Sequence, residues 1–177
     1  TTGFSRWANR FDRTIKDIFA VQSEIANAVA SALVEEVAAD GGQAPNIEAP
    51  TSGGTHNVAA FDAYLRGKAL YSLHADEKTY REALAQFDAA IDEDPKYAAA
   101  YSARARSLTS IANQYATADQ FIALYGEAEA AARKAVSLAP RYADAQSTLG
   151  VVLFQGKLDF RGARHPFEVS RRLGPGD

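Results

Sequence analysis

The 177-residue sequence contains no cysteine, no methionine, six prolines and one tryptophan. The lack of cysteine excludes disulfides, thiolate zinc sites, iron–sulfur clusters and a cysteine nucleophile. A net charge of −3 does not favour a nucleic-acid-binding protein that depends on phosphate contacts. No apolar run approaches the roughly 20 residues that a membrane-spanning helix needs, so we expect no membrane segment.

The N-terminus also lacks the features of a secretory signal. Thr1 to Phe4 include neither a basic region nor an apolar stretch, and no initiator methionine is present. We therefore expect a fragment of a longer protein. Its expected location is the cytoplasm, or the periplasm if the parent protein has an upstream membrane segment.

Alanine is abundant and occupies 37 positions, about a fifth of the chain. Because alanine loses no side-chain entropy in a helix and lets helices approach closely, this composition favours an all-α fold. Residues 57–177 show helical patterns throughout, and the sequence predicts that they form a helical repeat domain.

The part before the repeats is expected to have two segments. The sequence of residues 1–40 predicts a short extended stretch over 1–14 and a long helix over 17–39. An apolar stripe runs along that helix at Ile18, Val21, Ile25, Val29, Leu33 and Val37. Residues 41–56, GGQAPNIEAPTSGGTH, predict a flexible linker, because glycine and proline break helices and strands.

An internal repeat is the most informative pattern in residues 57–177. Residues 83–95 and 128–140 share an alanine, a Phe or Ala four residues later, a further alanine and a closing proline. A weaker third copy runs from Ala163 to Pro175. Each preceding helix carries a small residue followed, three positions on, by leucine: Gly67 and Leu70, Ala105 and Leu108, Gly150 and Leu153.

This pattern resembles the tetratricopeptide repeat, a helix–turn–helix unit of about 34 residues. The resemblance implies about three such repeats in a superhelix. We expect the small residues to lie where paired helices cross, with Phe87 and Phe167 filling the space beside them. The second repeat has about eleven extra residues around Asn113 to Phe121, which either extend both helices or form a loop.

The N-terminal segment carries a second resemblance. Trp7, the run Arg10-Phe11-Asp12-Arg13 and the run from Lys16 to Gln22 are similar to the end of the TolB-like domain of bacterial multidomain signalling proteins. In that family this segment precedes tetratricopeptide repeats, whose opening is similar to Ala60–Gly67. Such proteins commonly carry a class III adenylate cyclase domain or a winged-helix DNA-binding domain, neither of which is present in this chain.

No catalytic or metal-binding set emerges from the sequence. His56, His74 and His165 lack the spacing of metal ligands. The acidic run Asp92-Glu93-Asp94 suits an exposed helix end, and the paired glycines lack the Lys-Ser/Thr of a phosphate-binding loop. We therefore expect no metal, no cofactor and no enzymatic activity in this chain.

Tetratricopeptide arrays bind peptides on the face formed by the first helix of each repeat, so the resemblance implies a groove there. The predicted partner-binding residues are Phe61, Tyr64, Lys68, Tyr71, Arg106 and Phe154. The same stripe includes Ala99, Ser102, Thr109, Asp144, Ser147 and Val151. Aromatic rings and bases suit an extended acidic segment. The alternative is that the rings pack in the core and the bases are free surface charges.

These observations favour a non-catalytic protein–protein interaction and regulatory module of a bacterial signalling protein, with a protein or peptide partner and no nucleic acid. One alternative is the regulatory C-terminal part of a class III adenylate cyclase or of a winged-helix transcription regulator. Another is a small-molecule site between the 17–39 helix and the repeats. A homodimer is also open, because the extended stretch, the apolar stripe and the last repeat lack evident partners.

Overall fold

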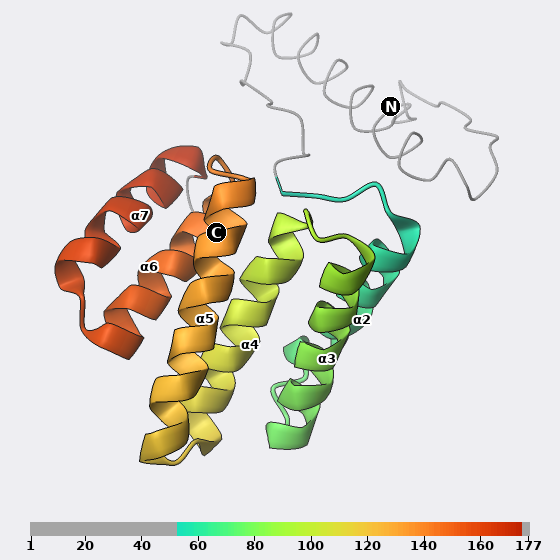
Figure 1. Ribbon diagram of the computed structural model, residues 1–177, viewed down its shortest axis with the longest axis horizontal. Coiled ribbons are helices and arrows are strands. Elements are labelled where there is room, and N and C mark those ends of the chain that lie inside the picture. Colours follow the sequence, from blue (N-terminus) through green and yellow to red (C-terminus); the bar gives the residue numbers. More distant parts are fainter. Residues whose placement is uncertain (1–52, 175–177) are drawn as a thin grey trace, which may run out of the picture. The chain divides into compact units, whose positions relative to one another are not determined.

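The structure is a computed structural model that describes residues 53–174. These residues form six helices and no strand (Figure 1). The helices are α2 (Val58–Ser72), α3 (Glu77–Glu93), α4 (Ala98–Tyr115), α5 (Ala118–Leu138), α6 (Ala143–Lys157) and α7 (Phe160–Leu173). The predicted extended stretch over 1–14 and the predicted helix over 17–39 lie outside the described residues.

The helices pack as three successive hairpins (Figure 1). α2 lies along α3, α4 along α5, and α6 along α7, while α3 contacts α4 and α5 contacts α6. The first helices of the hairpins also meet, α2 with α4 and α4 with α6, and together form one face. The all-α class predicted from the sequence is confirmed, and neighbouring hairpins pack as helical repeats do.

Local sequence accounts for the helix ends. The Asn57 side chain accepts hydrogen bonds from two first-turn N–H groups of α2, at 2.9 and 3.1 Å, and Asp76 caps α3 through the Thr79 N–H at 2.8 Å. α3 and α5 each end two residues before a proline, Pro95 and Pro140. The residue before a proline is disfavoured in the helical region, so neither helix can continue.

The extra residues of the second repeat lengthen both of its helices. α4 continues to Tyr115 and α5 begins at Ala118, so two residues separate them. Thr117 and Gln120 form a capping box at the start of α5. Of the two predicted alternatives, longer helices are correct and a protruding loop is wrong.

Glycines mark the helix crossings in the first and third hairpins. A Cβ atom on Gly67 would lie 2.6 Å from the Phe87 ring, and one on Gly150 would lie 2.7 Å from the Phe167 ring. Each phenylalanine therefore occupies the volume that a larger residue on the first helix would need. The predicted crossing residues and the predicted filling by phenylalanine are confirmed in these two hairpins.

An ion pair joins the second hairpin to the third. Lys157 Nζ of α6 lies 2.5 Å from a Glu129 carboxylate oxygen of α5, and Arg133 lies 2.8 Å from the other oxygen. The hydrogen bond from Lys157 is the main cause that holds the pKa of Glu129 below its ordinary value. Glu129 therefore stabilises the folded state when it is ionised, above the unfolded-state pKa of about 4.3, and this contribution is lost as the pH falls through the folded-state pKa.

We expect Glu129→Gln to lower the free energy of unfolding by about 0.5 kcal/mol at neutral pH, because the charge-assisted bond to Lys157 is weakened. Below its folded-state pKa the wild-type carboxyl is protonated, so the difference between the two proteins should shrink as the pH falls through that pKa. Urea unfolding over a series of pH values, from neutral to strongly acidic, measures this difference. A loss of equal size at every pH would contradict the assignment.

Candidate binding groove

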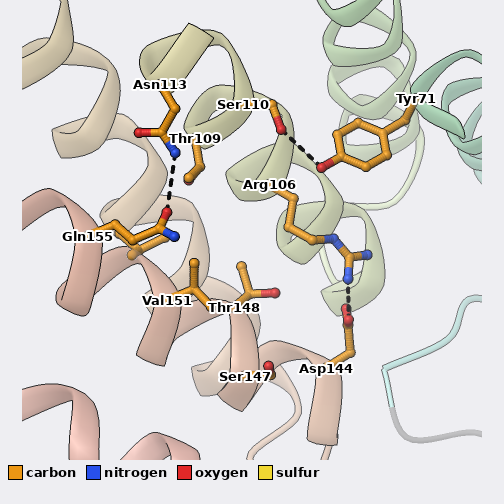
Figure 2. A pocket seen from close by; sticks show the side chains of 11 residues that line it. Tyr71, Arg106, Thr109, Ser110, Asn113, Asp144, Ser147, Thr148, Val151 and Gln155 are labelled. Carbon is orange, nitrogen blue, oxygen red and sulfur yellow. Dashed lines mark hydrogen bonds and ion pairs between the residues drawn. The ribbon is translucent and has the colours of Figure 1, made fainter. Parts of the chain in front are cut away.

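An open cavity of about 260 Å³ lies on the face formed by α2, α4 and α6. Figure 2 shows α4 side chains on one wall and α6 side chains on the facing wall, with Tyr71 of α2 at the edge. The lining residues are Tyr71, Arg106, Thr109, Ser110, Asn113, Asp144, Ser147, Thr148, Val151, Val152 and Gln155.

An ion pair between Arg106 and Asp144 closes one end of the cavity (Figure 2). Asp144 also accepts a hydrogen bond from the Ser102 hydroxyl at 2.7 Å, and that hydroxyl lies 2.9 Å from the hydroxyl of Thr148. Ser102 and Thr148 are buried, so the carboxylate that holds Arg106 is itself anchored to the packed helices. The same ion pair borders a second cavity of about 500 Å³, which is also lined by α7.

Two amides pair at the opposite end. Asn113 Nδ2 donates to Gln155 Oε1 at 3.2 Å, which links α4 to α6 (Figure 2). The hydroxyl of the buried Tyr125 donates to the oxygens of both amides, at 2.9 and 3.2 Å. Between the two ends, the Tyr71 hydroxyl lies 3.0 Å from that of Ser110 and links α2 to α4.

Most of the residues that line the cavity have uncharged polar side chains, although apolar atoms make up the larger part of its surface. Hydroxyl and amide groups dominate, with one ion pair and two valines. Such groups can exchange hydrogen bonds with a polar, uncharged ligand, and the N–H and C=O groups of an extended peptide have this character. Across residues 53–174, no group of three or more His, Asp or Glu side chains is arranged to hold a metal ion. No helix in this range has both the length and the apolar character required to cross a bilayer.

The six predicted groove residues lie in different environments: two border the cavity, and four do not. Tyr71 and Arg106 both border the cavity. Tyr64 belongs to the core, since it is 8% exposed and its ring centroid lies 5.0 Å from that of Tyr97. This burial raises the pKa of the Tyr64 hydroxyl. Lys68 is exposed, with its Nζ atom 5.7 Å from the centroid of the Tyr64 ring.

The remaining two aromatic residues lie away from the cavity. Phe61 is partly buried and packs against the core of the first hairpin. Phe154 is 46% exposed, and its ring centroid lies 5.3 Å from that of Phe160 on α7. The cavity therefore depends on the middle and C-terminal parts of α4 and on the facing side of α6.

Sequence reasoning did not select the amide pair. Asn113 and Gln155 lie one helical turn beyond Thr109 and Val151, which belong to the predicted stripe. The helical period therefore points to both residues. The sequence alone left open whether the helix that contains Thr109 continues through Asn113.

No protein-family model matches the chain. A curated protein of Rhizobium meliloti (strain 1021), named "Putative adenylate cyclase 3", is 31% identical to it over 134 residues. The match covers 74% of this chain and 22% of that protein, so the chain spans about a fifth of the relative's length. This distant similarity suggests a signalling-protein context.

Proposed function

We propose that residues 53–174 are a non-catalytic protein–protein interaction module of tetratricopeptide type, which holds an extended peptide of a partner protein in the groove of α2, α4 and α6. The cavity carries this proposal, because all three first helices contribute to it and its walls are rich in hydroxyl and amide groups. The repeat pattern and the stacking of the hairpins support the type of module.

The two ends of the groove suit different parts of a peptide. Asn113 and Gln155 offer donors and acceptors to the peptide backbone. Arg106 has five N–H donors, and its bond to Asp144 engages one of them, so the guanidinium retains donors for a peptide carbonyl or carboxylate. Because hydrogen bonds already hold these side chains in place, binding requires little ordering of the groove.

A second candidate function is regulation of a catalytic domain. The similarity to a protein named as an adenylate cyclase favours it. In this version the groove binds the same kind of peptide, and occupancy of the groove changes the activity of a cyclase domain in the parent protein. Cyclase activity of the parent protein, measured with and without a groove variant, tests this version.

A peptide-display screen on the full chain tests the binding proposal. We expect the enriched peptides to lose about tenfold or more in affinity for Ser147→Leu, because the larger side chain fills the cavity that Ser147 borders. Ser137→Leu makes the same change at an exposed site on α5, outside the groove, and should leave the affinity unchanged. Fluorescence anisotropy with labelled peptides measures both. Failure to enrich any peptide, or equal losses in the two variants, would count against the groove.

A further inference from the structure

The exposed apolar side chains gather at the two ends of the array. Eight large apolar residues are exposed within residues 53–174, and seven of them belong to the first and last hairpins. Those at the first end are Val58, Leu65 and Leu73, and those at the last are Phe154, Leu158, Phe160 and Phe167. Ile122, on the middle hairpin, is the eighth. Both ends of the array therefore have surfaces suited to packing.

The repeat register explains why an aromatic residue is exposed on the last hairpin. Tyr80, Tyr125 and Phe160 occupy the same position of the second helix in the three repeats. Tyr80 and Tyr125 are each 3% exposed, and each packs on the first helix of the next hairpin, Tyr80 beside Tyr115 and Tyr125 beside Gly156. Phe160 is 60% exposed. The last hairpin thus presents the surface that the next first helix covers elsewhere.

The first hairpin presents the other half of the same interface. α4 packs on the core of the first hairpin through Ala103, which is 3% exposed. The corresponding residue of α2 is Leu65, which is 47% exposed. Likewise Ile111 is fully buried in α4, whereas its counterpart Leu73 is 64% exposed. Within residues 53–174, no helix therefore packs on the face of α2 that corresponds to the packed face of α4.

A charged contact accompanies the packing of α4. Arg104 of α4 lies 2.7 Å from Asp88 on the preceding α3 and 3.1 Å from Glu127 on its own partner helix α5. The bond to Asp88 crosses the boundary between two hairpins. It therefore contributes to the order in which hairpins stack, as complementary charges do at interfaces.

The same charges recur at the ends of the array. In repeat register, Arg66 of α2 corresponds to Arg104, and Glu82 of α3 corresponds to Glu127. Glu168 of α7 corresponds to Asp88. Arg66 pairs with Asp62 in α2, and Glu168 pairs with Arg164 in α7. Both are exposed i,i+4 ion pairs, which are weak enough for Arg66 and Glu168 to take new partners.

We propose that a second copy of this chain continues the array, with its α2 packed on α6 and α7 of the first copy as α4 packs on α2 and α3. Leu65 and Leu73 then cover Phe160 and its neighbours, and Arg66 meets Glu168. The contact joins two unlike faces, so its repetition gives an open chain or a ring. This inference rests on the repeat register and is independent of peptide binding in the groove.

A twofold contact between two last hairpins is less favourable. α7 carries four arginines and one glutamate, so two copies of α7 placed face to face would repel each other. The face of α2 offers apolar residues together with the arginine that Glu168 can bind. Charge therefore favours the head-to-tail arrangement.

Sedimentation velocity of the full chain over a range of concentrations tests the proposal. The average mass of the wild type is expected to rise with concentration. Phe160→Glu alters one face and Leu65→Glu alters the other, and each alone should weaken association by about tenfold or more. Ile122→Glu places the same charge at a residue that is 77% exposed on the middle hairpin, and it should leave association unchanged. Circular dichroism checks that the variants are folded.

Mixing the two variants distinguishes the proposed arrangement from a twofold one. Phe160→Glu retains an intact α2 face, and Leu65→Glu retains an intact last hairpin. Their mixture should therefore form a one-to-one complex that is about tenfold or more tighter than the association of either variant alone. A wild type that stays monomeric at all concentrations, a mixture that forms no complex, or an equal loss in Ile122→Glu would each overturn the proposal.

Discussion

Gly67→Ala is expected to lower the free energy of unfolding by about 2–3 kcal/mol, whereas Gly126→Ala should raise it by about 0.5–1 kcal/mol. Both glycines lie inside helices, so each substitution gains the same helix propensity. The added methyl group at residue 67 would lie 2.6 Å from the ring of Phe87, which is 1% exposed and has no room to move. At residue 126 a Cβ atom would meet no neighbour within 4 Å.

Urea or thermal unfolding of the two variants measures this difference. Gly150→Ala provides an intermediate case, because the Phe167 ring that it would meet is 37% exposed and can shift. Phe87→Ala removes the ring that the new methyl group at residue 67 meets. The double variant Gly67→Ala/Phe87→Ala should therefore lose less unfolding free energy than the sum of the losses of the two single variants. Equal effects of alanine at residues 67 and 126 would contradict tight packing at the crossing.

The crossings could be predicted because their physical requirement is visible in the sequence. Two helices approach closely only where a small side chain allows it, so such residues recur at a fixed spacing. Gly67 and Gly150 pair with phenylalanines, whereas the middle hairpin has Ala105 and Ala132 at the same positions, both fully buried. Helix ends at prolines and capping side chains were predictable for the same reason: each depends on a few neighbouring residues.

The groove could be predicted only in part, because its residues depend on packing between distant segments. The helical period places Tyr64 on the predicted stripe, but it does not show that Tyr97, from the turn before α4, covers its ring. The repeat register also does not predict a glycine at residue 156, because the corresponding residue of α4 is the buried Ile111. Gly156 is required by the position of the Tyr125 ring, which no local pattern describes.

Gly156→Ala is expected to lower the free energy of unfolding by about 3 kcal/mol and to weaken peptide binding as well. A Cβ atom at this position would lie 2.0 Å from the Tyr125 ring. The ring is 3% exposed, and its centroid lies 4.6 Å from that of Phe121, so it cannot yield freely. Displacing it would also break the hydroxyl bonds to the amides of Asn113 and Gln155, which line the groove.

Tyr125→Phe separates the two consequences of this substitution. It keeps the ring and removes the hydroxyl, so the loss of unfolding free energy should be about 1 kcal/mol, while the amide pair loses the donor that orients it. Urea unfolding and anisotropy titration with a groove-binding peptide should show both losses for Gly156→Ala, but mainly the loss of affinity for Tyr125→Phe. If Gly156→Ala destabilises the chain and leaves peptide affinity unchanged, the amide pair supports the fold alone and the peptide contacts the Arg106 end of the groove.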